Sequence, residues 1–249
     1  MTVSDDNRPL VTPGPTLHGF AVTGVTPDAQ TALAAAMLIA VLANDGANVA
    51  AMVPVETGLD DPCEPGSHGS LIRWAAGHLD DPRLITPFAL EADRSAMHAA
   101  DASGTLLHGA AFDRAREELC DGRSVLVVAD AVGVLDPITP SLTMLDLMAR
   151  WSLAVVIVEP VSRWAVGHVR LIANAILSRE LSIAGVMLTL NEHGSADDEA
   201  VAAMRETMEA ALDRPVLVLP RVLSAHDRGE LLAAAASCGV HRLLLRHGA

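Results

Sequence analysis

Residues 20–43 read FAVTGVTPDAQTALAAAMLIAVLA, and this stretch decides the fold of the 249-residue chain. Its apolar start predicts a short buried strand, and its Ala- and Leu-rich end predicts a helix, so a tight loop joins the two. Gly24 and Thr31 stand at the ends of that loop. Their spacing follows the phosphate-loop pattern G-x-x-x-x-G-K-[ST], in which backbone N–H groups and a helix N-terminus hold an anion.

Two letters of this pattern are replaced. Ala29 stands at the second glycine and Gln30 at the lysine, and Pro27 has no backbone N–H to offer. A neutral Gln30 cannot neutralise phosphate charge, although the Thr31 hydroxyl could still contact a magnesium ion. Two interpretations therefore stand: a nucleotide loop with weakened charge, or the strand-to-helix corner of an ordinary α/β domain.

Composition restricts the classes of function. The chain carries a net charge of −14, and all 17 residues counted as Lys plus Arg are arginine. A chain without lysine has no Schiff-base or phosphate-loop lysine, and an acidic protein disfavours nucleic acid. We find no secretory signal and no apolar run of the roughly 18 residues that span a bilayer. The three cysteines are widely spaced, so we expect reduced thiols in a cytoplasmic protein that does not bind membranes.

Apolar runs alternate with helical periodicity along the chain. This alternation predicts an α/β fold, P-loop NTPase-like, with a mainly parallel sheet flanked by helices on both faces. We expect a flexible N-terminal arm over residues 1–17 and a single domain over residues 18–249. The predicted strands are 19–23, 49–55, 124–128, 154–158, 183–188 and 215–219, with a weak extended segment at 84–90. The predicted helices are 29–44, 70–78, 91–100, 106–120, 142–151, 166–179, 197–212 and 228–236.

The order of these motifs resembles the dethiobiotin synthetase family over most of the chain. The resemblance rests on FAVTG at 20–24, PVETG at 54–58, SVLVVADAVG at 124–133 and SLTMLDLMARWSLAVVIVEP at 141–160. It continues with the Gly167-His168 pair, LSIAGVMLT at 181–189 and PVLVLP at 215–220. The family implies a homodimeric ligase that uses ATP and magnesium to close a cyclic urea on 7,8-diaminopelargonic acid, with the substrate near the dimer interface.

The resemblance also implies roles for individual residues. The nucleotide loop comprises Gly24, Ala29, Gln30 and Thr31; the substrate-binding residues are Thr57, Gly58 and His168; the adenine side has Thr189 and Asn191; the metal ligands are Thr31 and Asp130. Thr57 and Gly58 also follow a predicted strand directly, where ligands collect in open α/β sheets. No catalytic residue is assigned.

Departures from the family pattern fall on charged positions. Gln30 and Val53 replace lysines, Ala129 replaces an acidic metal ligand, and a second acidic ligand falls near Ser70. Asp130 places a carboxylate one step along the chain from Ala129. Loss of one such electrostatic contact commonly costs about 2.7–4 kcal/mol of transition-state stabilisation.

We therefore expect a dethiobiotin-synthetase-like protein of biotin metabolism with a degenerate ATP site. It would be weakly active or inactive as a ligase and would act as a binding or partner subunit for a small diamine or carboxylate, with no cofactor. The alternative is a working ligase that uses ATP and magnesium at a nucleotide site rebuilt with Arg73, Arg163 or Arg170.

Overall fold

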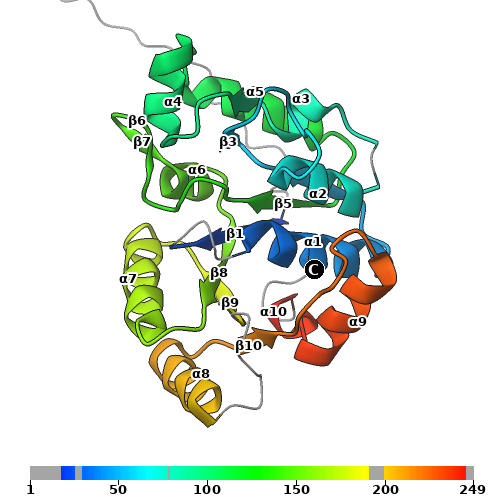
Figure 1. Cartoon of the computed structure of the whole chain (residues 1–249), viewed down its shortest axis with the longest axis vertical. Helices are drawn as coiled ribbons and strands as arrows, with labels where there is room; N and C mark the ends of the chain where they lie inside the picture. The colour runs from blue at the N-terminus through cyan, green and yellow to red at the C-terminus, as the bar shows by residue number, and fades with distance from the viewer. Residues whose placement is uncertain (1–17, 26–29, 78, 191–198, 245–249) are drawn as a thin grey trace, which may run out of the picture.

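The computed structural model describes residues 18–25, 30–77, 79–190 and 199–244. Six strands in these ranges form one parallel sheet at the centre of the chain (Figure 1). Their order across the sheet is β10 (Val216–Leu219), β9 (Ile183–Thr189), β8 (Ala154–Pro160), β1 (His18–Gly24), β5 (Val125–Ala129) and β2 (Val49–Met52). The predicted fold class is confirmed; the predicted arm at 1–17 lies outside the described residues.

Helices cover both faces of this sheet. On one side lie α1 (Thr31–Asn44), α9 (Arg228–Cys238) and α10 (His241–Leu244), and on the other lie α6 (Met144–Arg150), α7 (Ala165–Ser178) and α8 (Glu199–Leu212) (Figure 1). The helix α1 is apolar on all sides, and residues 34–40 are completely buried. Such a helix needs partners all round, and α1 packs against the sheet, α9 and α2 (His68–Ala75).

The remaining elements lie at the β2–β5 end of the sheet (Figure 1). They comprise β3 (Val55–Thr57) in a parallel pair with β4 (Phe88–Leu90), the helices α3 (Pro82–Ile85), α4 (Ala96–Ser103) and α5 (Gly109–Leu119), and the antiparallel pair β6 (Pro137–Thr139) and β7 (Leu142–Thr143). The sequence patterns did not predict β6, β7 or α10.

Two predicted extended segments are wrong in part. The strand predicted over 49–55 stops at Met52 and resumes at Val55, because Pro54 has no N–H for a ladder and Val53 N–H donates to the carbonyl of Ile85 instead. The first half of the segment predicted as extended over 84–90 belongs to α3. That helix begins at a proline, behind an Asp81 side chain that accepts from a backbone N–H.

Other predicted helix starts are also wrong: α5 begins at Gly109 instead of 106, and α6 begins at Met144 instead of 142 because Leu142 and Thr143 form β7. Residues 91–95 are not helical, and α4 runs from Ala96 to Ser103. The helix predicted from Ser70 begins two residues earlier at His68, because the hydroxyl of Ser67 caps it by accepting from the N–H of Ser70. The consequence is that His68 becomes the first residue of α2, at the carboxyl end of the strands.

The chain leaves neighbouring strands toward opposite faces of the sheet. From β1 it turns into α1, whereas β5 and β8, on either side of β1, lead to α6 and α7 on the other face (Figure 1). Ligands of open α/β sheets bind where such connections diverge, outside the carboxyl ends of the strands. Both crevices beside β1 are therefore candidate sites.

Candidate functional site

The loop after β1 ends in a residue with left-handed backbone geometry. Gln30 has a φ of +58° and a ψ of +40°, and its side chain makes no capping hydrogen bond to α1. A residue with a Cβ pays roughly 1–2 kcal/mol for this conformation. The helix α1 then begins at Thr31, which is buried. Ala29, the other replaced position of the loop, lies outside the described residues.

Asp130 follows β5 directly and is buried, with 3% exposure. Its Oδ2 accepts from the Thr23 hydroxyl at 2.5 Å, and its Oδ1 accepts from the N–H groups of Val132 and Gly133 at 2.9 Å each. Burial raises the pKa of the Asp130 carboxyl, and these three hydrogen bonds offset part of the rise. The Thr31 hydroxyl donates to the Asp130 carbonyl at 2.7 Å, which ties the start of α1 to the end of β5.

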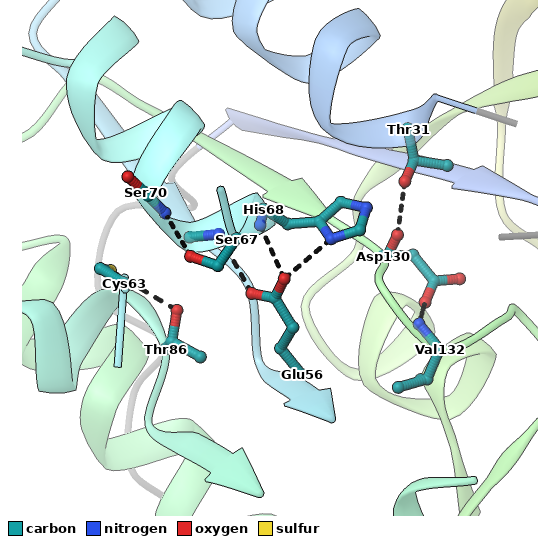
Figure 2. A network of polar contacts seen from close by, with 10 residues as sticks. Thr31, Glu56, Cys63, Ser67, His68, Ser70, Thr86, Asp130 and Val132 are labelled. Carbon is teal, nitrogen blue, oxygen red and sulfur yellow. Dashed lines mark hydrogen bonds and ion pairs between the residues drawn. The ribbon is translucent and has the colours of Figure 1, made fainter. Parts of the chain in front are cut away.

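A buried carboxylate also holds the start of α2. Glu56 Oε1 accepts from the His68 N–H at 2.6 Å and lies 2.8 Å from His68 Nδ1, while Glu56 Oε2 accepts from the Gly69 N–H at 3.1 Å. An ionised carboxylate can only accept, so Nδ1 carries the proton in this contact and Nε2 is the free ring nitrogen. In Figure 2 the His68 ring extends from α2 toward Thr31 and Asp130.

These groups meet in a small pocket in the crevice between β1 and β5. Its described lining consists of Gly24, Val25, Thr31, His68, Asp130, Ala131, Val132 and Gly133. The cavity volume is about 20 Å³, which is room for roughly one water molecule. Among these lining residues there is no arginine, so His68 is the one side chain that could carry positive charge.

The three arginines considered as replacements for lysine lie elsewhere. Arg73 Nε donates to the carbonyl of Asp80, and the Arg163 guanidinium lies over the Trp164 ring at 4.7 Å from its centroid. Arg170 is an exposed residue of α7. Within the described part of the chain, no group of three or more His, Cys, Asp or Glu residues could hold a metal ion.

A second Glu–His pair lies in the crevice between β1 and β8. Glu159 follows Val158, the strand partner of Gly24, and its Oε1 lies 2.8 Å from Nδ1 of His168 on α7. Glu159 is 2% exposed, and its Oε2 is buried without a hydrogen-bond partner among the residues that the structure describes. Burial raises the pKa of Glu159. The hydrogen bond from His168 and the positive charge of His168 offset part of that rise.

The other predicted site residues lie on different elements, β3 of the two-stranded sheet and β9 of the central sheet. Thr57 ends β3, Gly58 follows with a φ of +76°, and the buried Thr189 ends β9 and pairs with Pro160. The described lining of the pocket includes the predicted residues Gly24, Thr31 and Asp130. It does not include Thr57, Gly58, Thr189 or His168. Asn191 lies outside the described residues.

The sequence analysis missed His68 and Glu159. For His68 a signal existed: the N-cap residue Ser67 starts the helix early enough to place the histidine in its first turn. For Glu159 the signal was weak, because the residue ends the apolar strand segment AVVIVEP and reads as its polar boundary.

Comparisons with known proteins match most of this chain, including the whole central sheet. A family profile described as an AAA domain matches residues 18–222. The ATP-dependent dethiobiotin synthetase BioD of Anaeromyxobacter dehalogenans is 31% identical over 206 residues, covering 82% of this chain and 90% of the relative. The protein of the same name from Novosphingobium aromaticivorans is 32% identical over 213 residues, covering 81% and 93%. The chain belongs to the dethiobiotin synthetase family.

A more distant relative, the ATP-dependent dethiobiotin synthetase BioD of Chromohalobacter salexigens, is 26% identical over 225 residues, which is 87% of this chain. The family profile spans the whole central sheet, from the start of β1 to beyond the end of β10. In this member of the dethiobiotin synthetase family, the described lining of the phosphate-loop pocket offers no fixed positive charge to a triphosphate. None of the helices in the described ranges combines the length and the apolar character needed to cross a membrane.

Proposed function

We propose that this chain is a dethiobiotin-synthetase-like protein of biotin metabolism whose nucleotide site no longer drives ligation, and that it acts as a binding or partner subunit. One observation carries the proposal: the described pocket beside Thr31 holds no arginine, in a chain that has no lysine. Phosphoryl transfer depends on positioning and on stabilising the charge of the transferred group. A pocket without fixed cations supplies little of that stabilisation.

The bonding of Asp130 supports the same proposal. Both oxygens of its carboxylate already accept hydrogen bonds from Thr23, Val132 and Gly133. A magnesium ion favours near-ideal octahedral coordination by carboxylates, waters and phosphates. The three bonds leave about one lone-pair position on Asp130, so this residue could supply a single ligand atom to the ion.

The second candidate function is a working ATP- and magnesium-dependent cyclo-ligase with a rebuilt site. The placement of Thr31 and Asp130 favours it, because both residues line the pocket at the start of α1 and the Thr31 hydroxyl donates to the Asp130 backbone carbonyl. In either case we expect a homodimer, which light scattering on the purified full chain would establish.

Calorimetric titration of the full-length chain with ATP and magnesium chloride tests the proposal. The dethiobiotin synthetase of Anaeromyxobacter dehalogenans, 31% identical, serves as the positive control. We expect no saturable heat for this chain up to about millimolar ATP, where the binding free energy is only about −4 kcal/mol. Micromolar binding of ATP would contradict the proposal and favour the working ligase.

A matched pair of variants tests the physical cause. Gln30→Lys restores a cation at the loop position, and Gln30→Met provides a side chain of similar length without charge. If missing charge is the reason for weak binding, the lysine variant gains about tenfold or more in ATP affinity over the methionine variant. Equal affinities in the two variants would show that another feature limits binding.

A further inference from the structure

We propose that the pocket beside Thr31 binds the protonated amino group of a small molecule, with His68, Thr31 and Asp130 as its hydrogen-bond acceptors. This inference rests on the proposed function, because it assigns to the pocket a cationic ligand in place of a phosphate. It follows from the direction of each hydrogen bond around the pocket. An ammonium group has three N–H donors and no acceptor, so it suits a pocket whose side chains only accept when the His68 ring is neutral.

His68 is an acceptor because Glu56 fixes its tautomer. Glu56 Oε1 lies 2.8 Å from Nδ1 and also accepts the backbone N–H of His68, while Glu56 Oε2 accepts from Gly69. With Nδ1 bound to the carboxylate as a donor, the neutral ring keeps its lone pair on Nε2. The ring lines the pocket, and Figure 2 shows it extending toward Thr31 and Asp130.

Thr31 is an acceptor because its single hydroxyl proton is already committed. That proton is donated to the carbonyl of Asp130 at 2.7 Å, and the side chain is buried at 5% exposure. Only the two lone pairs of the oxygen remain for a ligand in the pocket.

Asp130 adds one free acceptor position. A carboxylate has about four lone-pair sites, and three donors use three of them: the Thr23 hydroxyl and the N–H groups of Val132 and Gly133. Those two N–H groups are thereby withdrawn from any anion that enters the pocket.

The size of the pocket and its ligand types favour an amine over other cations. A volume of about 20 Å³ accepts a group the size of water, such as an ammonium head. Magnesium prefers carboxylate and water oxygens to imidazole, and a transition metal usually takes three or more protein ligands. The opposing feature is the N-terminus of α1, whose free N–H groups favour an anion.

Titration of the full-length, ¹⁵N-histidine-labelled chain with butylammonium chloride at about pH 8 tests the proposal, because most unperturbed imidazoles are neutral there. Magnesium chloride and inorganic phosphate are titrated separately. We expect a saturable shift of the His68 imidazole signals with butylammonium at a dissociation constant on the order of millimolar, as befits a ligand of five heavy atoms. The signals are assigned with a His68→Ala variant.

Two variants locate the binding. Thr31→Val removes the acceptor oxygen at similar volume, and His68→Ala removes the ring; each should weaken butylammonium binding about tenfold or more. The matched control is His98→Ala, because His98 is an exposed histidine of α4 that contacts Ser95. This control should bind like the original chain. If His68→Ala does not fold, Thr31→Val alone decides.

Several outcomes would overturn the inference: no saturation by butylammonium, undiminished binding in Thr31→Val, or His68 shifts with magnesium or phosphate but not with the amine. These outcomes are separate from the failure of the proposed function, which is measured by ATP binding. If neither ATP nor butylammonium binds, the proposed function is supported and the amine-binding inference is contradicted. If ATP binds tightly, the proposed function is contradicted, whether or not butylammonium binds.

Discussion

The Glu56–His68 and Glu159–His168 pairs make the same glutamate-to-histidine contact, but they differ in how many glutamate oxygens accept hydrogen bonds. In each, an oxygen of a buried glutamate lies 2.8 Å from Nδ1 of a histidine on the following helix. Glu56 uses both oxygens, since three donors of His68 and Gly69 surround it. Glu159 uses one oxygen, and within the described ranges its Oε2 is buried without a hydrogen-bond partner.

The position of each histidine in its helix explains the difference. His68 is the first residue of α2, so the free N–H groups of that helix start point at Glu56. His168 is the fourth residue of α7, and its own N–H already bonds the carbonyl of Trp164 within the helix. A histidine at a helix start thus brings backbone donors with it, and one a turn later does not.

The Glu56–His68 pair therefore includes a helix cap, whereas the Glu159–His168 pair is a contact with a single donor. Glu56 acts at once as the cap of α2 and as the group that orients His68. Glu159 orients His168 but stabilises no helix start in the described structure. Substitutions that treat the two pairs alike should therefore give unequal results.

The largest difference is expected from truncating each glutamate. Glu56→Ala leaves the buried N–H of Gly69 and the N–H of His68 without their acceptor, and we expect a loss of about 3 kcal/mol in unfolding free energy. Glu159→Ala also removes an oxygen that has no partner, so its loss should be smaller, about 1 kcal/mol. Urea unfolding followed by circular dichroism measures both. Equal losses, or a larger loss for Glu159→Ala, would contradict the comparison.

Glycines beside the two histidines provide a second, smaller contrast. A Cβ at Gly69 would lie 2.2 Å from Thr86 Oγ1 and 3.0 Å from Cys63 Sγ, so Gly69→Ala should cost about 1–3 kcal/mol. A Cβ at Gly167 meets nothing within 4 Å, so Gly167→Ala should stabilise α7 by about 0.5–1 kcal/mol.

Thermal and urea unfolding of both alanine variants check these signs. The double variant Gly69→Ala with Thr86→Ala removes the clashing hydroxyl and should recover part of the lost stability. If Gly69→Ala alone is neutral, the start of α2 is less tightly packed than the structure indicates.

The smallest effect is a dependence on pH at Glu159. Burial raises the pKa of this carboxyl, so the folded chain keeps the proton at pH values where the unfolded chain has released it. This contribution to stability is therefore present at low pH and is lost as the pH rises through the pKa of the folded chain. Relative to the original chain, Glu159→Gln should gain stability as the pH rises above about 4.3, the ordinary pKa of a glutamate.

Urea unfolding across that pH range measures the effect as a change in the difference between the two chains. The buried amide of the variant adds a constant offset, so the slope with pH is the quantity of interest. Glu118→Gln, which removes an exposed carboxyl on α5, controls for the loss of one charge. If the stability of Glu159→Gln relative to the original chain stays constant or falls with rising pH, burial does not raise the pKa of Glu159.

The fold could be predicted further than the site. Apolar strand segments such as 154–158 and the apolar helix that begins at Thr31 are local patterns, and they placed the elements of the central sheet close to their observed bounds. Pro54 and Pro82 changed two boundaries: Pro54 has no N–H for a sheet ladder, and the fixed φ of Pro82 suits the first residue of α3. At the site, Gly24, Thr31 and Asp130 could be found from their spacing after strands, whereas His68 could not once its helix was started two residues late.

By itself the sequence determined the α/β alternation, the phosphate-loop spacing at 24–31 and the absence of lysine, since these depend on residue type and on neighbours in the chain. Tertiary structure alone decided which hydrogen-bond donors and acceptors remain free. Thr23 and Asp130 are 107 residues apart, and Thr31 and Asp130 are 99 apart, yet both contacts form at one edge of the sheet. The polarity of a pocket is what remains after such bonds are made, and those bonds depend on the alignment of strands that are distant in the sequence.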